Sequence, residues 1–137
     1  MLHVLVIDGQ GGGIGRQLVA AIKSACPDAA ITAVGTNVAA TTAMLKAGAD
    51  NGATGENAVV VGCRRADVIA GPIGIVIADA LLGEITPAMA LAVGRSAAKR
   101  VLIPVNHCDN ILVGVGDAPL SLLAQEAARR IAELLPR

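Results

Sequence analysis

The fold is decided by a glycine-rich stretch near the N-terminus, which reads Val6-Ile7-Asp8-Gly9-Gln10-Gly11-Gly12-Gly13-Ile14-Gly15. The apolar run that leads into it, residues 2–7, predicts a buried strand. Apolar residues after it recur at helical spacing as far as Ala25, and Pro27 ends that helix. A strand that passes through glycines directly into a helix is the opening unit of a doubly wound α/β fold.

The rest of the chain alternates between strands and helices. The later strands are expected at residues 31–34, 67–70, 100–103 and 111–115, and residues 73–77 form a further strand or a buried extended segment. The later helices are expected to begin at Thr36 or Asn37, near Thr54, at Thr86-Pro87 and at Asp117. Such alternation builds a parallel sheet with helices on both sides. We therefore expect a single three-layer Rossmann-like α/β domain over residues 1–137, with a mainly parallel sheet.

The composition excludes several classes of protein. Of the 137 residues, 54% are hydrophobic and 16% are charged, which excludes a disordered chain. Eleven Lys and Arg balance eleven Asp and Glu, and there is no Phe, Tyr or Trp, so we expect no nucleic-acid partner. The high apolar content indicates a sheet buried on both faces, an apolar surface closed by self-association, or both. We expect a homo-oligomer.

The sequence also predicts a cytoplasmic protein that does not span a membrane. No uninterrupted apolar run reaches the roughly 18 residues that a membrane-spanning helix needs. The first residues enter a strand-like run without the pattern of a secretion signal. The three cysteines, Cys26, Cys63 and Cys108, are scattered, which is typical of free buried thiols in a reducing compartment.

Five of the sixteen glycines lie within residues 9–15, which we call the glycine loop. Glycines at a strand-to-helix junction let the backbone approach a phosphate closely, and the unpaired amides of the helix point at it. The alternative is a loop that needs glycine only for positive φ. On the first interpretation, the loop holds the phosphate of a small molecule, and the predicted ligand contacts are Asp8, Gly9, Gln10, Gly11, Gly12, Gly13, Ile14, Gly15 and Arg16. Asp8 could hold a metal or a ribose, but we expect it to accept hydrogen bonds from the loop amides.

Known phosphate motifs fit this loop to different degrees. The dinucleotide pattern G-x-G-x-x-G fails in both registers, because its last position falls on Ile14 or on Arg16. The nucleoside-triphosphate pattern fails as well, since Gln10 and Gln17 stand where it needs a glycine and a hydroxyl. The spacing G-x-x-x-G-I-G fits fully from Gly9.

That spacing resembles the coenzyme loop of short-chain dehydrogenases, with Asp8 in the place of their usual threonine. The resemblance implies NADP or NAD as cofactor. Their catalysis is excluded because it needs a tyrosine, which the chain lacks. The end of the second strand reads Gly35-Thr36-Asn37, without the acid that holds the ribose of NAD, so the sequence favours NADP, with Arg16 near its 2′-phosphate.

A wider resemblance covers most of the chain and concerns a family of small bacterial proteins known only as a domain of unknown function. It implies a Rossmann-like fold and no particular activity. The residues that carry it are Ile7-Asp8-Gly9-Gln10-Gly11-Gly12-Gly13-Ile14-Gly15, Gly35-Thr36-Asn37, Met44-Leu45-Lys46-Ala47-Gly48-Ala49, Gly52-Ala53-Thr54-Gly55-Glu56-Asn57, Gly71-Pro72-Ile73-Gly74 and Leu82-Gly83-Glu84-Ile85-Thr86.

Polar or glycine-rich segments follow four of the predicted strands. They cover residues 8–15, 35–37, 71–74 and 104–107. The carboxyl ends of parallel strands meet at one edge of the sheet, where such folds bind ligands. We therefore add to the predicted ligand contacts Gly35, Thr36, Asn37, Gly71, Pro72 and Asn106. The alternative is that strand ends simply need turn residues.

Two residues are candidates for acid–base catalysis if the protein is an enzyme. Glu56 lies in a polar helix start, and His107 follows a strand and titrates near neutral pH. No cluster has the spacing of a metal site. The leading hypothesis is a nucleotide-binding module that acts as a sensor or accessory subunit. The alternatives are an oligomeric enzyme that uses NAD(P) or another phosphate-bearing ligand, and a purely structural subunit.

Overall fold

The computed structural model describes residues 1–105 and 109–135, and its centre is a five-stranded, all-parallel sheet in the order β3-β2-β1-β4-β5. This order is that of the doubly wound Rossmann-like fold without its sixth strand, so the predicted fold class is confirmed. The strands are β1 (His3–Asp8), β2 (Ala30–Gly35), β3 (Asn51–Thr54), β4 (Val68–Pro72) and β5 (Lys99–Ile103).

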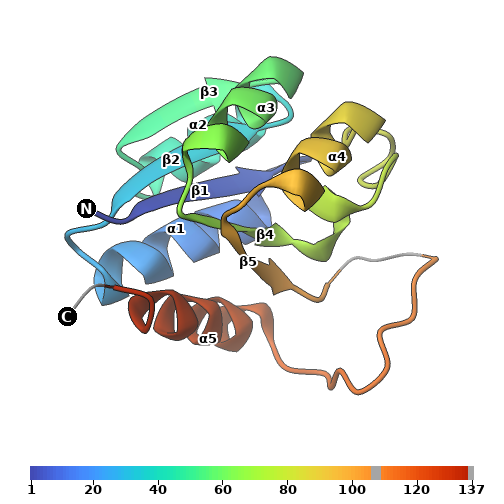
Figure 1. Cartoon of the computed structure of the whole chain (residues 1–137). Helices are drawn as coiled ribbons and strands as arrows, with labels where there is room; N and C mark the ends of the chain where they lie inside the picture. Colours follow the sequence, from blue (N-terminus) through green and yellow to red (C-terminus); the bar gives the residue numbers. More distant parts are fainter. Residues whose placement is uncertain (106–108, 136–137) are drawn as a thin grey trace.

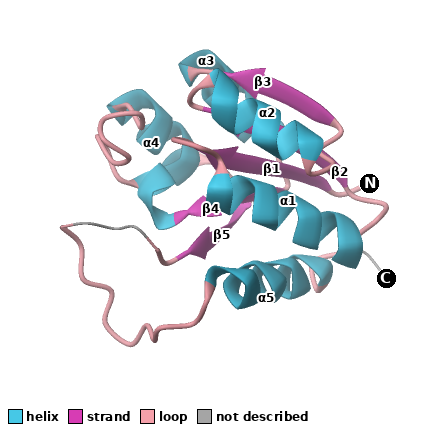
Figure 2. Ribbon diagram, turned by 180° about the vertical axis from the view of Figure 1, so that it is seen from behind, coloured by secondary structure: helices cyan, strands magenta, loops and turns pink. Residues whose placement is uncertain are grey.

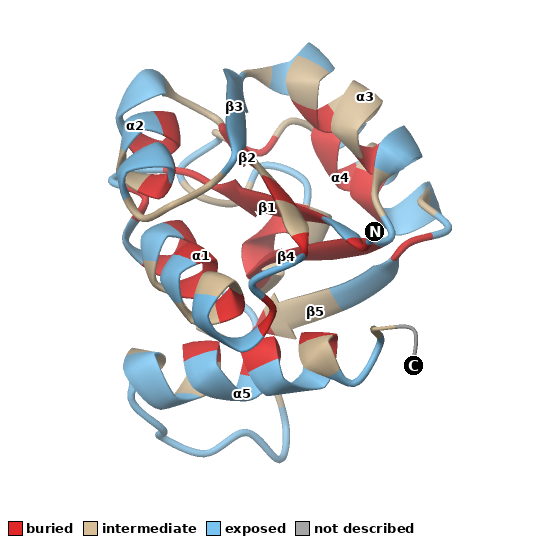
Figure 3. Ribbon diagram, turned by 90° about the vertical axis from the view of Figure 1, so that its left-hand side faces the viewer, coloured by how far each residue is buried: buried red, intermediate tan, exposed pale blue. Residues whose placement is uncertain are grey.

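Helices cover both faces of the sheet, as Figures 1 and 2 show. They are α1 (Gly13–Ala25), α2 (Val38–Lys46), α3 (Glu56–Arg65), α4 (Pro87–Arg95) and α5 (Leu120–Ala132), with a short 3-10 helix, η1 (Ile73–Val76), after β4. One apolar cluster joins the sheet to α1, α2 and α5, and a second joins it to α3, η1 and α4. The protein therefore has three layers, with the buried residues at their two contacts (Figure 3).

Strand β1 shows why the sequence specifies these layers. Successive side chains of a strand point to opposite faces of the sheet. Accordingly, Val4 and Val6 belong to the cluster under α1 and α5, whereas Leu5 and Ile7 belong to the cluster under α3 and α4. A run of consecutive apolar residues is thus buried on both sides, as we expected for a parallel strand.

Several element boundaries follow the predicted capping residues. The Asn37 side chain accepts a hydrogen bond from the Ala40 amide at the start of α2, and the Thr86 hydroxyl accepts one from the Met89 amide at the start of α4. Helix α5, however, begins after Pro119, so the prediction that Asp117 caps it is wrong.

The strand predicted at residues 111–115 is absent, the segment predicted as a strand or a buried extended stretch at residues 73–77 is mostly a 3-10 helix, and one strand was missed. Residues 73–76 form η1, because the chain turns directly after Pro72 instead of extending along the sheet. Residues 111–115 have no strand partner and are mostly exposed. Strand β3 (Asn51–Thr54) carries only small and polar residues, all exposed, and it exists because it pairs with β2. Apolar periodicity cannot reveal such a strand.

Two expectations about composition can be compared with the structure. Cys26 and Cys63 are free and buried, as predicted, while Cys108 lies outside the described residues. Among the helices in residues 1–105 and 109–135, none combines the length and the apolar character that crossing a bilayer requires.

Candidate functional site

The glycine loop leaves the carboxyl end of β1 and forms a tight turn into α1. The Gly12 amide donates to the Gly9 carbonyl at 2.9 Å and closes the turn. Gln10 has φ 51° and Gly12 has φ 74°, so only two loop residues take the left-handed conformation, and one of them is a glutamine. Positive φ alone therefore does not explain five glycines.

Asp8 supplies a negative charge to this junction from within the protein. Its carboxylate is 3% exposed and accepts hydrogen bonds from the Gly9 amide at 2.8 Å and the Gly15 amide at 2.6 Å. Burial raises the pKa of Asp8, the amide hydrogen bonds oppose that rise, and the nearby charge of Glu84 adds to it. The positive end of α1 is therefore partly satisfied by Asp8.

The five glycines of the loop fall into two groups. Gly9, Gly12 and Gly15 are buried, and a methyl group on any of them would lie within 3 Å of a neighbouring atom. At Gly15, for example, it would lie 2.5 Å from the Met44 sulfur. Gly11 and Gly13 are exposed, and a methyl group there meets nothing within 4 Å.

The amides of Gly11 and Gly13 are also the loop donors that remain unused. Among the residues that the structure describes, neither donates a hydrogen bond. Both glycines line a pocket of about 240 Å³, which the Leu81 and Leu120 side chains close from the other side. The loop therefore offers a ligand two backbone donors. The amides of Gly9, Gln10, Gly12 and Gly15 already donate hydrogen bonds within the protein.

Glu84 is a site residue that the sequence did not reveal. It lies between η1 and α4, yet its carboxylate reaches the ends of β1 and β2. One oxygen accepts from the Gln10 amide at 2.7 Å, and the other accepts from the Thr36 hydroxyl at 2.9 Å and the Asn37 side-chain amide at 2.7 Å. Burial raises the pKa of Glu84, but these hydrogen bonds outweigh burial and leave the pKa below its usual value.

The backbone that carries Glu84 has an uncommon conformation. Asp79, Leu81 and Leu82 all have positive φ although none is glycine. The hydrogen bonds of Glu84 and the contact of Leu81 with the pocket hold this segment, residues 77–86, against the glycine loop. The only sequence signal was the Gly83-Glu84 pair within a turn-like stretch, which specifies no partner.

Two of the four predicted strand-end segments come together. The Asn37 side chain donates to the Gln10 carbonyl at 2.9 Å and links the end of β2 to the glycine loop. Gly71 and Pro72 are buried in β4 and do not line the pocket, and a methyl group on Gly71 would collide with the Ile7 carbonyl. Gly35 is likewise required by its close contact with Thr41.

The remaining predicted site residues lie apart from the pocket or outside the described residues. Arg16 is exposed and does not line the pocket. The Glu56 carboxylate, at the start of α3, accepts a hydrogen bond from Thr86 at 2.5 Å and is also outside the pocket lining. Asn106 and His107 lie outside the described residues. Within those residues, no three His, Cys, Asp or Glu side chains are grouped as metal ligands.

Comparison with solved structures shows a likeness at the level of the fold. A dodecameric FMN-dependent UbiX-like decarboxylase from Escherichia coli O157:H7 is 20% identical to this chain, with a TM-score of 0.46 over 96% of this chain and 76% of that one. No curated protein matches the sequence.

The expectation of NADP or NAD is contradicted at the end of β2, and the similar solved structure is described as FMN-dependent. The site itself gives a physical reason. The end of β2, where we expected a 2′-phosphate, is filled by the Glu84 carboxylate, whose negative charge repels a phosphate.

The wider resemblance noted in the sequence is confirmed. Residues 3–136 match the family described as Domain of unknown function (DUF3842), and the chain belongs to that family.

Proposed function

We propose that the protein binds a small phosphate-bearing molecule at the β1–α1 junction. The observation that carries the proposal is the pair of exposed, unused amides at Gly11 and Gly13, at positions where nothing in the structure requires a glycine. Both positions line the pocket, so a side chain at either one would add atoms at the edge of the pocket. Glycine there is explained by the close approach of a ligand atom that accepts hydrogen bonds.

The dimensions of the pocket limit the ligand. Its volume of about 240 Å³ lies below the roughly 300–1,000 Å³ that is usual for pockets that enclose a drug-sized ligand. The pocket therefore accommodates a phosphate and a little more, and the rest of the ligand remains outside it. A sugar phosphate or a mononucleotide fits this description.

The charges of the site predict a modest affinity. Among the described residues that line the pocket, Asp8 is the only ionisable one, and it is acidic. Two amides and the N-terminus of α1 attract an anion, while the carboxylates of Asp8 and Glu84 repel it. We expect the affinity to increase as salt is lowered, and to be highest for a phosphate monoester in its singly charged form.

The pocket supports binding more than catalysis. Both oxygens of Asp8 accept backbone hydrogen bonds, so this carboxylate is committed to the loop. The described lining contains no other group that titrates or could act as a nucleophile. A sensor or accessory subunit agrees with these features, and a catalytic role for Glu56 or His107 stays a prediction.

The absence of aromatic residues makes a direct test simple. Because the chain has no Phe, Tyr or Trp, the purified protein has almost no absorbance between 260 and 280 nm. A co-purified nucleotide or flavin is then visible in the spectrum, and native mass spectrometry gives its mass. Calorimetric titration with inorganic phosphate, AMP, ADP and FMN extends the test, with adenosine as the phosphate-free control.

A matched pair of variants locates the ligand. Gly13→Val fills the mouth of the pocket and is expected to abolish binding. Gly94→Val introduces the same side chain at an equally open helical position far from the pocket and is expected to leave binding unchanged. Equal binding by wild-type protein and Gly13→Val, or no binding of any phosphate in the panel, contradicts the proposal.

A further inference from the structure

The segment that connects β5 to α5 carries an exposed apolar stripe. Residues 109–119 extend away from the body of the fold in both Figure 1 and Figure 2. Within it, Ile111 is 90% exposed, Val113 is 95% exposed and Val115 is 45% exposed. These alternate residues would share one face in an extended segment. In the single chain, residues 112–115 form a turn, in which the Val115 amide donates to the Leu112 carbonyl at 3.4 Å and Gly114 has φ 87°. The apolar side chains of residues 111–115 thus face solvent without a strand partner in the described chain, and pairing as a strand requires that turn to open.

The outer edge of β5 is unpaired within the described residues. In the doubly wound order, a sixth strand lies beside the fifth. Here β5 pairs with β4 on one side, and its other side has no strand among residues 1–105 and 109–135. An open edge of this kind accepts a strand from another chain.

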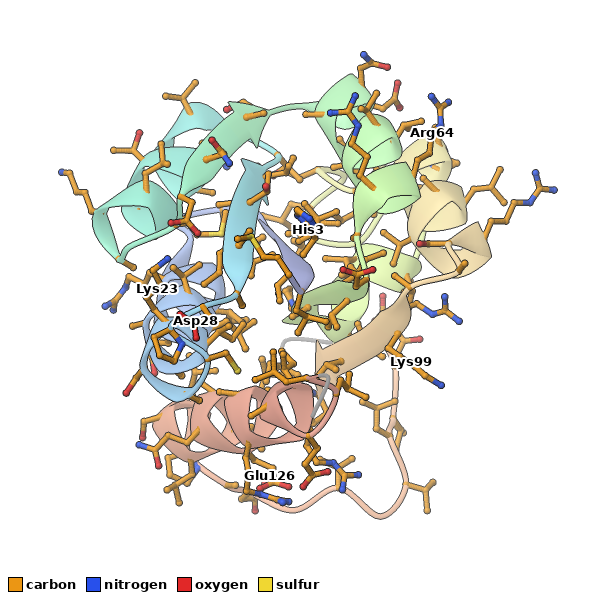
Figure 4. The ribbon with its side chains drawn as sticks, turned by 60° about the vertical axis from the view of Figure 1, so that its left-hand side comes forward. His3, Lys23, Asp28, Arg64, Lys99 and Glu126 are labelled. Atoms are coloured by element: carbon orange, nitrogen blue, oxygen red, sulfur yellow. The ribbon has the colours of Figure 1, made fainter. Side chains whose placement is uncertain are left out.

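A groove runs beside this open edge, between β5 and α5. Its volume is about 610 Å³, and its apolar lining includes Val101, Ile103, Leu123 and Leu134. Figure 4 labels Lys99 and Glu126, which lie on its two sides. An apolar groove along a sheet edge fits the side chains of an added strand, because alternate residues of that strand point into it.

The charges of groove and segment are complementary. Lys99, Arg100 and Arg130 line the groove, although the Arg100 guanidinium also donates to the Ser96 carbonyl at 2.8 Å. The acidic residues there, Glu126 and Glu133, are paired with Arg129. Residues 109–119 contain Asp109 and Asp117 and no Lys, Arg or His, so the apolar stripe is flanked by negative charges that match the basic rim.

The segment cannot become a parallel sixth strand of its own sheet. A parallel neighbour needs a crossover of about a dozen residues or more, and only residues 104–110 separate β5 from the stripe. An antiparallel placement is hindered as well. Leu120, at the start of α5, is fixed in the pocket lining at the carboxyl edge, so residues 116–119 alone would have to return along the whole strand.

We propose that two copies of this chain associate by exchanging these segments, each laying residues 111–115 along β5 of the other. The five residues of the segment match the five residues of β5. The exchange is reciprocal and symmetric, covers the β5 edge of each copy and buries both apolar stripes. It is independent of the phosphate site, which lies between the glycine loop and residues 81 and 120.

The oligomeric state of two variants tests the proposal. Native mass spectrometry and light scattering at micromolar concentration are expected to show a wild-type dimer. Val113→Asp is expected to be a monomer with an unchanged circular-dichroism spectrum, since that side chain is 95% exposed in the single chain. Leu82→Asp alters a side chain that is equally exposed on another part of the surface and is expected to remain dimeric.

A synthetic peptide separates the two halves of the contact. The Val113→Asp protein retains an intact β5 groove, so a peptide of residues 109–117 with the wild-type sequence is expected to bind it. The same peptide with aspartate at position 113 is expected not to bind. Any one of three results would overturn the proposal. The wild-type protein is monomeric, or the Val113→Asp variant still dimerises, or the monomeric variant does not bind the wild-type peptide.

Discussion

The inner and outer sides of the glycine loop use the same residue for different reasons. On the inner side, Gly9, Gly12 and Gly15 are buried, and each lacks room for a methyl group. On the outer side, Gly11 and Gly13 have open space and unused amides. Packing of the fold therefore requires three of the five glycines. The other two have no structural requirement for glycine, and ligand binding would explain them.

This difference teaches that a glycine-rich loop is not equivalent to a phosphate cradle. The protein spends the Gly9, Gln10 and Gly15 amides on its own carboxylates, Asp8 and Glu84. The acceptor of every backbone amide in the loop must be identified before the amides that remain for a ligand are known. The comparison can be tested by substitutions that affect one side of the loop at a time.

Gly12→Ala is expected to have the largest effect. The new methyl group would lie 2.9 Å from the Ala40 Cα atom, and alanine is strained at φ 74°. We expect a loss of about 3 kcal/mol in the free energy of unfolding. Urea unfolding followed by circular dichroism measures it, because the chain has no aromatic fluorophore. Gly11→Ala, one residue away in open space, is the control and should change little.

Asp8→Asn tests the internal anion on the inner side. An amide has one acceptor oxygen and brings two N–H donors toward loop amides that also donate. Because the side chain is buried, we expect a loss of about 2 kcal/mol. Asp28→Asn, at an exposed carboxylate, serves as the control. A fully stable Asp8→Asn protein would show that the loop does not depend on this charge.

Glu84→Gln tests how residues 77–86 are held to the loop, with an expected loss of about 1 kcal/mol at neutral pH. The pKa of Glu84 is lowered by folding, so its contribution is present above the ordinary value of 4.5 and is lost as the pH falls through the folded value. The difference in stability between wild type and variant should therefore shrink from pH 7 toward pH 3. A difference that stays constant with pH contradicts this role of the Glu84 charge.

Gly13→Ala is expected to have the smallest effect on stability, within about 0.5 kcal/mol. A methyl group there meets nothing within 4 Å. The same variant should nonetheless weaken the binding of any phosphate ligand, because Gly13 lines the pocket and the methyl group adds an atom there. Thermal unfolding with and without the ligand measures both effects. A large loss of stability in the absence of ligand would place Gly13 with the inner glycines.

Local patterns predicted the elements whose neighbours lie close in sequence. The spacing of Ile14, Leu18 and Ile22 predicted α1, and the capping residues Asn37 and Thr86 predicted the starts of α2 and α4. These local patterns failed where pairing with a neighbouring strand decides whether a segment is a strand. Residues 111–115 have strand-forming side chains but pair with no strand in the described part of the chain. Strand β3 has only small and polar residues and is a strand because β2 lies beside it.

The candidate site shows the same limit. The sequence indicated that Asp8 accepts amide hydrogen bonds from the loop, and this is confirmed. It gave no role to Glu84, which meets Thr36 across 48 positions of the chain. Its contacts depend on how η1 turns back over the sheet, and no local pattern encodes that path.

The amino-acid sequence by itself determined the alternation of strands and helices, the parallel sheet and the membership of the family, because these depend on apolar spacing and on motifs within short stretches. Only the tertiary structure decided which glycines are packed, which amides remain unused and which carboxylate closes the end of β2. These depend on groups brought together from distant parts of the chain, where a shift of one ångström makes or removes a hydrogen bond.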